Sequence, residues 1–251
     1  MRTLSDYSDF LEALIKSLAH ETSFSCTPDL SALIEQPRLI AVVNHATPLS
    51  WMPAMCTLAL EVMKAGGGDR CPRGVVDKWF YTNPVTKTIA EYLTQSDQHM
   101  NFDDLVRNFQ DSQKTDLIIF PEGAHAMFGD VGEIRTFRSH RFIEISLRTQ
   151  SPILLAVHRG SEGWSVPLHI PPEWSAWIRP FSKFFGEHLP SMQSLNFPMI
   201  PEKMGHFSMT CELYEPGITL QDLSEDIVER KAQLATEAEH IRQRMSEILK
   251  R

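Results

Sequence analysis

The sequence predicts an α/β fold with a mostly parallel central sheet that is flanked by helices. Three units carry this prediction, because each is an apolar run, typical of a buried strand, that ends in a polar turn: residues 39–51, 115–130 and 151–160. Segments with helical patterns separate the three units, which is the order expected of parallel strands joined by helices. With 251 residues, 42% of them hydrophobic, the chain is long enough for a sizeable core, and we predict a single domain over residues 1–251.

The chain opens with a predicted amphipathic helix in residues 5–21, behind Ser and Asp cap candidates. Its polar face is acidic as much as basic, so we expect it to pack on the body, and a membrane-surface role is the alternative. Residues 23–38 are interpreted as irregular. The apolar positions that recur at helical spacing are Phe10, Leu11, Leu14, Ile15 and Leu18.

A helix over residues 51–68 is predicted to follow the first strand. Pro53 fits only in the first turn of such a helix, and Gly66 to Gly68 mark its end. Ser50 is then a natural helix cap. The further elements expected are a short strand at 73–81, helices at 83–95, 101–113 and 141–150, a strand and turn at 209–220, and a charged C-terminal helix at 224–251.

Composition excludes several classes of function. The chain has 24 Lys and Arg against 32 Asp and Glu, a net charge of −8 that gives no support to nucleic-acid binding. The four cysteines are scattered without a C-x-x-C pair, so neither a disulfide framework nor a metal site is predicted. The N-terminus lacks signal-peptide features and no apolar run approaches the roughly 20 residues of a membrane span. We therefore expect a cytoplasmic protein.

Polar residues gather where the predicted strands end. Asn44 and His45 follow the first strand, Pro121-Glu122-Gly123 follow the second, and His158-Arg159 end the third. Ligands of open α/β sheets bind at the carboxyl ends of the strands, so these turns form the candidate site. Taken alone, His45 fits either a structural or a catalytic role.

Four stretches resemble the conserved blocks of the glycerolipid acyltransferases, which include the glycerol-3-phosphate and lysophosphatidic acid acyltransferases. "NHATPLSW" resembles their N-H-x-x-x-x-D block, and "FPEGAHA" resembles their F-P-E-G-T-R-S block. "SPILLAVHRG" and "LYEPGITL" are similar to two later strands of that family. The resemblance covers about residues 30–160 and 208–249, and F-P-E-G placed after N-H is its specific part.

The resemblance implies acyl transfer from a thioester, acyl-CoA or acyl-carrier protein, to a hydroxyl or amine, with no further cofactor. The family histidine, here His45, would act as general base on the acceptor, and Ser50 stands at the catalytic aspartate position. The acceptor-binding residues implied are Asn44, Pro121, Glu122, Gly123 and His125. Lipid metabolism, and phospholipid biosynthesis in particular, is the implied context.

Ser50 in place of the family aspartate is the first departure. A serine hydroxyl can accept a bond from the imidazole N–H but supplies no negative charge, so His45 should be a weaker base. Three alternatives stay open: Asp77 or Asp97 approaches the ring from elsewhere in the chain, activity is low or altered, or the protein is a catalytically silent binder of acyl chains or of a partner protein. A nucleophilic Ser50 is disfavoured, because the G-x-S-x-G elbow is absent.

The second departure concerns phosphate recognition. His125 stands at the position of the family arginine, and the stretch 92–99, where a second phosphate-binding arginine belongs, contains none. Arg135, Arg138 and Arg141 could substitute, or could form a solvated face. The sequence thus favours an acceptor other than glycerol phosphate, such as a non-phosphorylated lipid, an amine or a natural-product hydroxyl.

An aromatic- and proline-rich insert at about 160–208 is the last feature. Two interpretations stay open: a wall for the acyl chain that could also contact a membrane peripherally, or a loop region that packs a small core of its own. The partners expected are the thioester donor, with carrier protein as one form of it. The aromatic residues of the insert are Trp164, Trp174, Trp177, Phe181, Phe184, Phe185 and Phe207.

Overall fold

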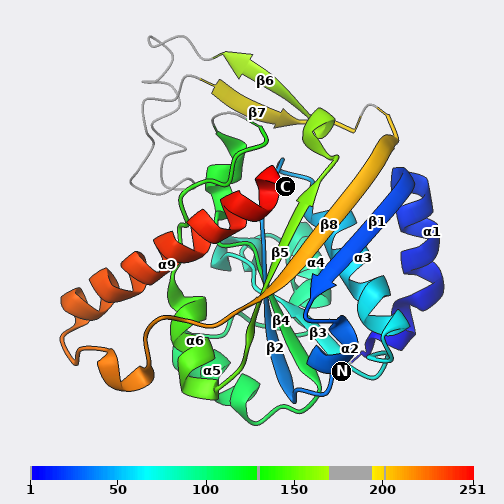
Figure 1. Cartoon of the computed structure of the whole chain (residues 1–251). Coiled ribbons are helices and arrows are strands. Elements are labelled where there is room, and N and C mark those ends of the chain that lie inside the picture. Colours follow the sequence, from blue (N-terminus) through cyan, green and yellow to red (C-terminus); the bar gives the residue numbers. More distant parts are fainter. Residues whose placement is uncertain (1, 129–130, 170–193, 201) are drawn as a thin grey trace.

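The computed structural model describes residues 2–128, 131–169, 194–200 and 202–251, and it confirms the α/β class (Figure 1). A six-stranded sheet has the order β1-β8-β5-β2-β4-β3, and its neighbouring strands run parallel except for β5 and β8. The strands of this sheet are β1 (Ala19–Thr27), β2 (Arg38–Val43), β3 (Cys71–Gly74), β4 (Thr115–Ile119), β5 (Ile153–Arg159) and β8 (Met204–Tyr214).

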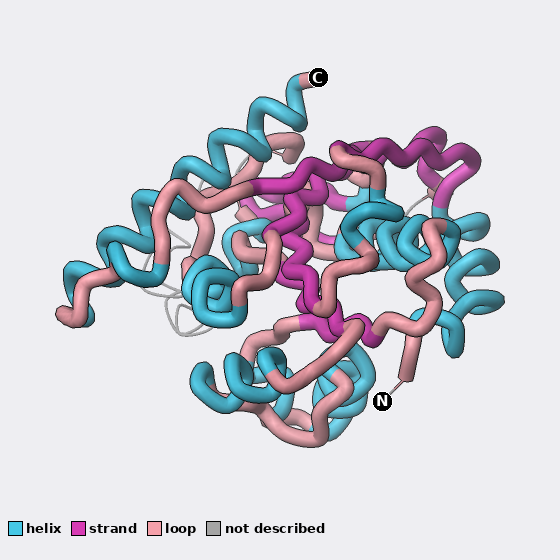
Figure 2. Tube along the Cα trace, turned by 60° about the horizontal axis from the view of Figure 1, so that its bottom comes forward, coloured by secondary structure: helices cyan, strands magenta, loops and turns pink. Residues whose placement is uncertain are grey.

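Helices cover both faces of the sheet (Figure 2). One face packs against α5, α6 and α9, and the opposite face packs against α2 and α3, with α1 outside α3. The predicted N-terminal amphipathic helix and C-terminal helix are both confirmed. The helices are α1 (Ser8–Leu18), α2 (Leu30–Leu33), α3 (Trp51–Lys64), α4 (Pro84–Thr94), α5 (Phe102–Gln110), α6 (Arg141–Thr149) and α9 (Ile227–Lys250).

The three central strands are those that the apolar runs predict. β2, β4 and β5 are buried almost throughout, because helices cover them on both faces. Their register places Ile40 between Leu117 of β4 and Ile153 of β5. Since all three strands run in the same direction, the turns that follow them meet at one edge of the sheet.

Local signals explain where several helices begin and end. Pro53 lies in the first turn of α3, and Gly66, with a φ of +102°, follows the end of this helix. Asn83 caps α4 by accepting a hydrogen bond from the Val85 N–H, and Asp226 caps α9 in the same way.

Two expectations about the N-terminal half are wrong. Residues 23–38 are not irregular, because β1 covers 19–27 and α2 covers 30–33. β1 lies at the sheet edge with most of its side chains exposed, so its sequence is polar and shows no apolar run. The strand expected at 73–81 is β3, which ends at residue 74; Asp77 then accepts a hydrogen bond from the Trp79 N–H and starts a 3₁₀ turn.

Part of the predicted insert forms a second, two-stranded sheet from β6 (Ser165–His169) and β7 (Ser194–Pro198). Trp164 is buried beside it, and Phe207 belongs to β8 of the main sheet. The remaining aromatic residues named for the insert lie outside the described residues. Within the described parts of the chain, every helix is too short or too polar to cross a bilayer.

Gly160 lets the chain turn closely past β8 after β5 ends. Its φ is +103°, and a Cβ there would lie 2.1 Å from the carbonyl oxygen of His206. We expect Gly160→Ala to lower the free energy of unfolding by about 1–3 kcal/mol, measured by urea denaturation. Gly163→Ala is the matched control, since nothing lies within 4 Å of a Cβ there. Equal stability of the two variants would contradict this account.

Candidate active site

The candidate site lies at the carboxyl edge of the sheet. β2 ends at Val43, β4 ends at Ile119, and β5 ends at Arg159, so the turns at 44–50 and 120–123 are neighbours. Helix α3 begins at Trp51, directly after the first of these turns. The N-terminus of α3 therefore follows His45 closely in the chain. The dipole of a helix favours negative charge near its N-terminus.

Glu122 ties the two turns together. Its side chain is fully buried; Oε1 accepts a hydrogen bond of 2.6 Å from the His45 N–H, and Oε2 accepts one of 2.6 Å from the Arg135 N–H. Burial raises the pKa of Glu122 to about 7, against the lowering effect of these two donors and of the Arg135 and Arg242 charges. The carboxylate therefore fixes the backbone of the histidine turn.

The His45 ring is set for one tautomer. His45 is a partly buried residue; the centre of its ring lies 4.7 Å from the centre of the Phe120 ring, and its Nδ1 lies 3.2 Å from the carbonyl oxygen of Thr47. A carbonyl oxygen only accepts, so Nδ1 carries the proton and Nε2 keeps its lone pair. Burial lowers the pKa of His45 to about 4, which keeps the ring neutral near pH 7.

The Ser50 hydroxyl is not hydrogen-bonded to the imidazole. Its side chain is fully buried, its hydroxyl donates to the Thr47 carbonyl over 2.8 Å, and its own N–H donates to the same oxygen over 3.1 Å. Ser50 precedes α3, as expected, but its hydroxyl does not bond the first turn of that helix. The short side chain turns back into its own turn, a common alternative for serine.

The Thr47 carbonyl is thus the group that holds the ring. A backbone atom leaves no residue-type signal, so sequence reasoning missed it.

Asn44 faces the neighbouring strand. Its Oδ1 accepts a 2.8 Å bond from the His158 N–H, and its Nδ2 donates over 3.2 Å to the His158 carbonyl. The amide is buried, so both of its polar atoms serve the backbone of β5. This geometry gives Asn44 a part in shaping the turn, with its amide turned to the protein.

The Pro121-Glu122-Gly123 turn packs against residues 134–138. The Pro121 carbonyl accepts a 2.8 Å bond from the Arg138 N–H, and Gly123 has a φ of +53°, a conformation that favours glycine. His125 Nδ1 lies 2.9 Å from the Thr136 carbonyl. One loop therefore carries Pro121, Gly123 and His125. Glu122 joins this loop to the turn that carries His45.

Three of the other candidate side chains interact with groups other than the His45 ring. Asp77 pairs with Arg138 at 3.4 Å, and the Arg141 guanidinium lies 5.3 Å from the centre of the Phe102 ring. Asp97 is exposed. Among the described residues, no carboxylate is hydrogen-bonded to the His45 ring, and no group of three or more His, Cys, Asp or Glu is arranged to hold a metal ion.

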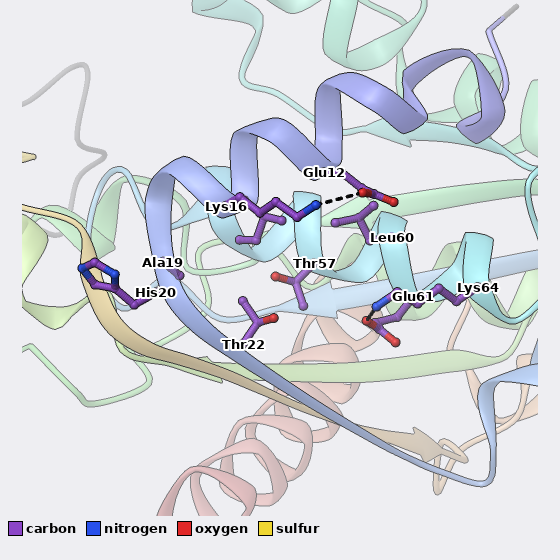
Figure 3. A pocket seen from close by; sticks show the side chains of 10 residues that line it. Glu12, Lys16, Ala19, His20, Thr22, Thr57, Leu60, Glu61 and Lys64 are labelled. Atoms are coloured by element: carbon purple, nitrogen blue, oxygen red, sulfur yellow. Dashed lines mark hydrogen bonds and ion pairs between the residues drawn. The ribbon is translucent and has the colours of Figure 1, made fainter.

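A cavity of about 230 Å³ lies apart from these residues, between α1, β1 and α3 (Figure 3). Thr57 and Leu60 of α3 face Thr22 of β1 across it. The ion pairs Lys16–Glu12, at 3.2 Å, and Lys64–Glu61, at 2.6 Å, also line it. None of the candidate site residues lines this cavity.

No protein family model and no curated protein matches the chain. One similar solved structure is the crystal structure of the 1-acyl-sn-glycerophosphate (LPA) acyltransferase PlsC from Thermotoga maritima. It is 15% identical, covers 98% of this chain and 80% of its own, and superimposes with a TM-score of 0.49. A superposition of this quality assigns neither a family nor a function to this chain.

Proposed function

We propose that the protein is an acyltransferase that moves an acyl group from a thioester, acyl-CoA or acyl-carrier protein, to a hydroxyl or amine acceptor. The observation that carries the proposal is the state of His45: a partly buried residue with a neutral imidazole whose Nδ1–H is held by the Thr47 carbonyl. Its Nε2 takes no hydrogen bond from any residue that the structure describes. The N-H and F-P-E-G blocks, which resemble those of glycerolipid acyltransferases, are joined by the hydrogen bond from the His45 backbone N–H to the Glu122 carboxylate.

In the proposed reaction Nε2 of His45 takes the proton of an acceptor O–H as the oxygen attacks the thioester carbonyl carbon and forms a tetrahedral intermediate. An amine acceptor attacks with its own lone pair, and Nε2 takes the N–H proton from the intermediate. When this collapses, the C–S bond breaks, and the leaving thiolate takes the proton back from the imidazolium. A thioester is already activated, so one histidine base suffices and no acyl-enzyme is required. The positive end of the α3 dipole favours the charge that develops on the oxyanion.

Thr47 replaces part of what an aspartate would supply. Its carbonyl orients the ring and selects the tautomer, but as a neutral group it stabilises the imidazolium less than a carboxylate does. The low pKa of His45, about 4, is consistent with a weak base. We therefore propose a slow enzyme.

We propose an acceptor without a phosphate group. Three observations support this choice: His125 bonds the Thr136 carbonyl where the family has arginine, Arg138 pairs with Asp77, and Arg141 lies over the Phe102 ring. An arginine recognises phosphate through two parallel N–H donors, and these donors must be free to bind its oxygens.

A panel assay tests the function. Purified protein is incubated with acyl-CoA and acyl-carrier protein of several chain lengths, each with glycerol phosphate, lysophospholipid, monoacylglycerol or an amine, and thiol release is measured. We expect release that depends on a non-phosphorylated acceptor and an acylated product in the mass spectrum. Equal release with and without every acceptor would overturn the proposal.

A catalytically silent acyl-chain or partner-binding protein is the second candidate. The observation that favours it is the position of Ser50, which leaves the His45 ring without a carboxylate. The variant Ser50→Asp separates the two candidates.

We expect Ser50→Asp to raise turnover by roughly 10-fold or more, because a carboxylate beside the imidazole stabilises its cation. The same carboxylate raises the pKa of His45 from about 4, so the acidic limb of the pH profile of kcat/KM should move up by about 1–3 pH units. Glu122 is present in both proteins, so the difference between the two profiles reports on His45.

Ser50→Asn is the matched control, because it has the shape of aspartate without its charge and should shift neither turnover nor the limb. Continued absence of turnover in Ser50→Asp, together with tight binding of acyl chains, would favour the silent protein.

A further inference from the structure

The peptide unit between Asn44 and His45 lies just beyond the strand ladders. The pairing of β2 with β4 ends at Val42 and its pairing with β5 ends at Val43. The last backbone hydrogen bond between this end of β2 and β5 is the 3.4 Å bond from the Asn44 N–H to the Ala156 carbonyl. Side chains must therefore hold the peptide that carries His45.

Two buried side chains hold this peptide at its opposite ends. The Asn44 carbonyl accepts a 2.8 Å bond from Nε2 of His158, and the His45 N–H donates the 2.6 Å bond to Glu122. One partner comes from the β5 side of β2 and the other from the β4 side. The peptide plane is fixed from both sides, and with it the direction in which the His45 side chain leaves the backbone.

His158 is fully buried and stacks on Phe207, with ring centres 5.3 Å apart and planes 25° apart. Because a carbonyl only accepts, Nε2 carries the proton. Nδ1 is buried and has no hydrogen-bond partner among the described residues. An unpaired buried polar atom destabilises the fold, so an apolar side chain would serve better if this position were needed only for packing. Burial lowers the pKa of His158 to about 3, so the ring stays a neutral donor over the working pH range.

We propose that His158 is a positioning residue for His45: by donating to the Asn44 carbonyl, it aims the imidazole of the base at the acceptor. The predicted effect on kcat rests on the proposed function. The predicted effect on the orientation of the His45 ring does not depend on that function. Without the donor, the peptide can rotate, Nδ1 of His45 leaves the Thr47 carbonyl, and the lone pair no longer stays on Nε2. A small misplacement of a catalytic group costs up to about 100-fold in rate.

A pair of amide substitutions isolates the donor. The longer side chain of His158→Gln can bring its N–H group to the position of Nε2, whereas the amide of His158→Asn ends near the position of Nδ1 and falls short of the Asn44 carbonyl. Both bury an amide of the same polarity. We expect His158→Asn to lower kcat by roughly 10- to 100-fold with the KM for the thioester within about threefold, and His158→Gln to recover most of that loss.

Phe207→Leu is the packing control, because it disturbs the same stack and leaves the donor in place. It should lower the melting temperature without lowering kcat as His158→Asn does. If kcat falls equally in His158→Gln and His158→Asn, the positioning role is wrong.

The tautomer of His45 gives a readout that needs no turnover. In ¹⁵N-histidine spectra, with the His45 signals assigned from a His45→Gln sample, wild type and His158→Gln should show protonated Nδ1 and unprotonated Nε2. His158→Asn should show a mixture of the two tautomers. Identical His45 signals in all three proteins would overturn the proposal. If no thioester is turned over but the tautomer shifts as expected, the proposed function fails and the positioning role stands.

Discussion

His45→Gln is expected to lower acceptor-dependent thiol release by about 10²–10⁴-fold, the usual contribution of a general base. The imidazole Nε2 is the group proposed to remove the acceptor proton, and a glutamine amide cannot accept a proton at neutral pH. The backbone N–H of residue 45 still reaches the Glu122 carboxylate, so the fold should be kept. Steady-state rates at saturating donor and acceptor measure the loss of thiol release, and circular dichroism on the same samples shows whether the fold is kept.

His240→Gln is the control for this substitution, because the His240 ring is largely exposed on α9 and pairs with Glu237 at 3.4 Å. It should leave the rate within about twofold. If His45→Gln releases thiol at the wild-type rate, His45 is not the general base of the reaction.

Glu122→Gln should be the most destabilising of the substitutions named here. The carboxylate accepts two short backbone bonds inside a fully buried site, and a glutamine side chain has one oxygen to offer. Its NH₂ group would then face the His45 or the Arg135 N–H, leaving a buried donor unpaired. We expect the free energy of unfolding to fall by about 2–4 kcal/mol, measured by urea denaturation.

Activity should fall together with stability, because the same bond fixes the turn that carries His45. Glu133→Gln is the matched control: its carboxylate is exposed and lies 3.8 Å from Arg135. If Glu122→Gln unfolds at the same urea concentration as Glu133→Gln, Glu122 does not fasten the two turns.

The sequence predicts the centre of the fold better than its edge. β2, β4 and β5 are apolar because both of their faces are covered, so they stand out as runs. Most side chains of β1 are exposed at the sheet edge, and its polar sequence has the composition of a loop. β3 ends early because Asp77 bonds the Trp79 N–H, a local side-chain bond that competes with strand pairing.

The position of the candidate site could be predicted from the sequence, but the hydrogen bonds within it could not. Parallel strands bring His45 and Glu122 to one edge, and that follows from strand order alone. Which atoms then meet depends on rotamers and backbone groups. The Glu122 carboxylate binds two N–H groups, Ser50 bonds within its own turn, and the Thr47 carbonyl takes the ring. No residue pattern encodes a backbone carbonyl, and the ring of His158 gave no sign of its orientation.

The place of β8 between β1 and β5 has a consequence for how the protein is made. β1 pairs with β8 from Ala19 opposite Met204 to Thr27 opposite Glu212, so β1 finds this neighbour only after residues 204–212 have been made. Until residues 204–214 emerge, β1 and the flank of β5 are open edges on a nascent chain, and open edges pair with whatever strand is near. β1 is therefore covered later than β2, β4 and β5, although it precedes all three in the chain.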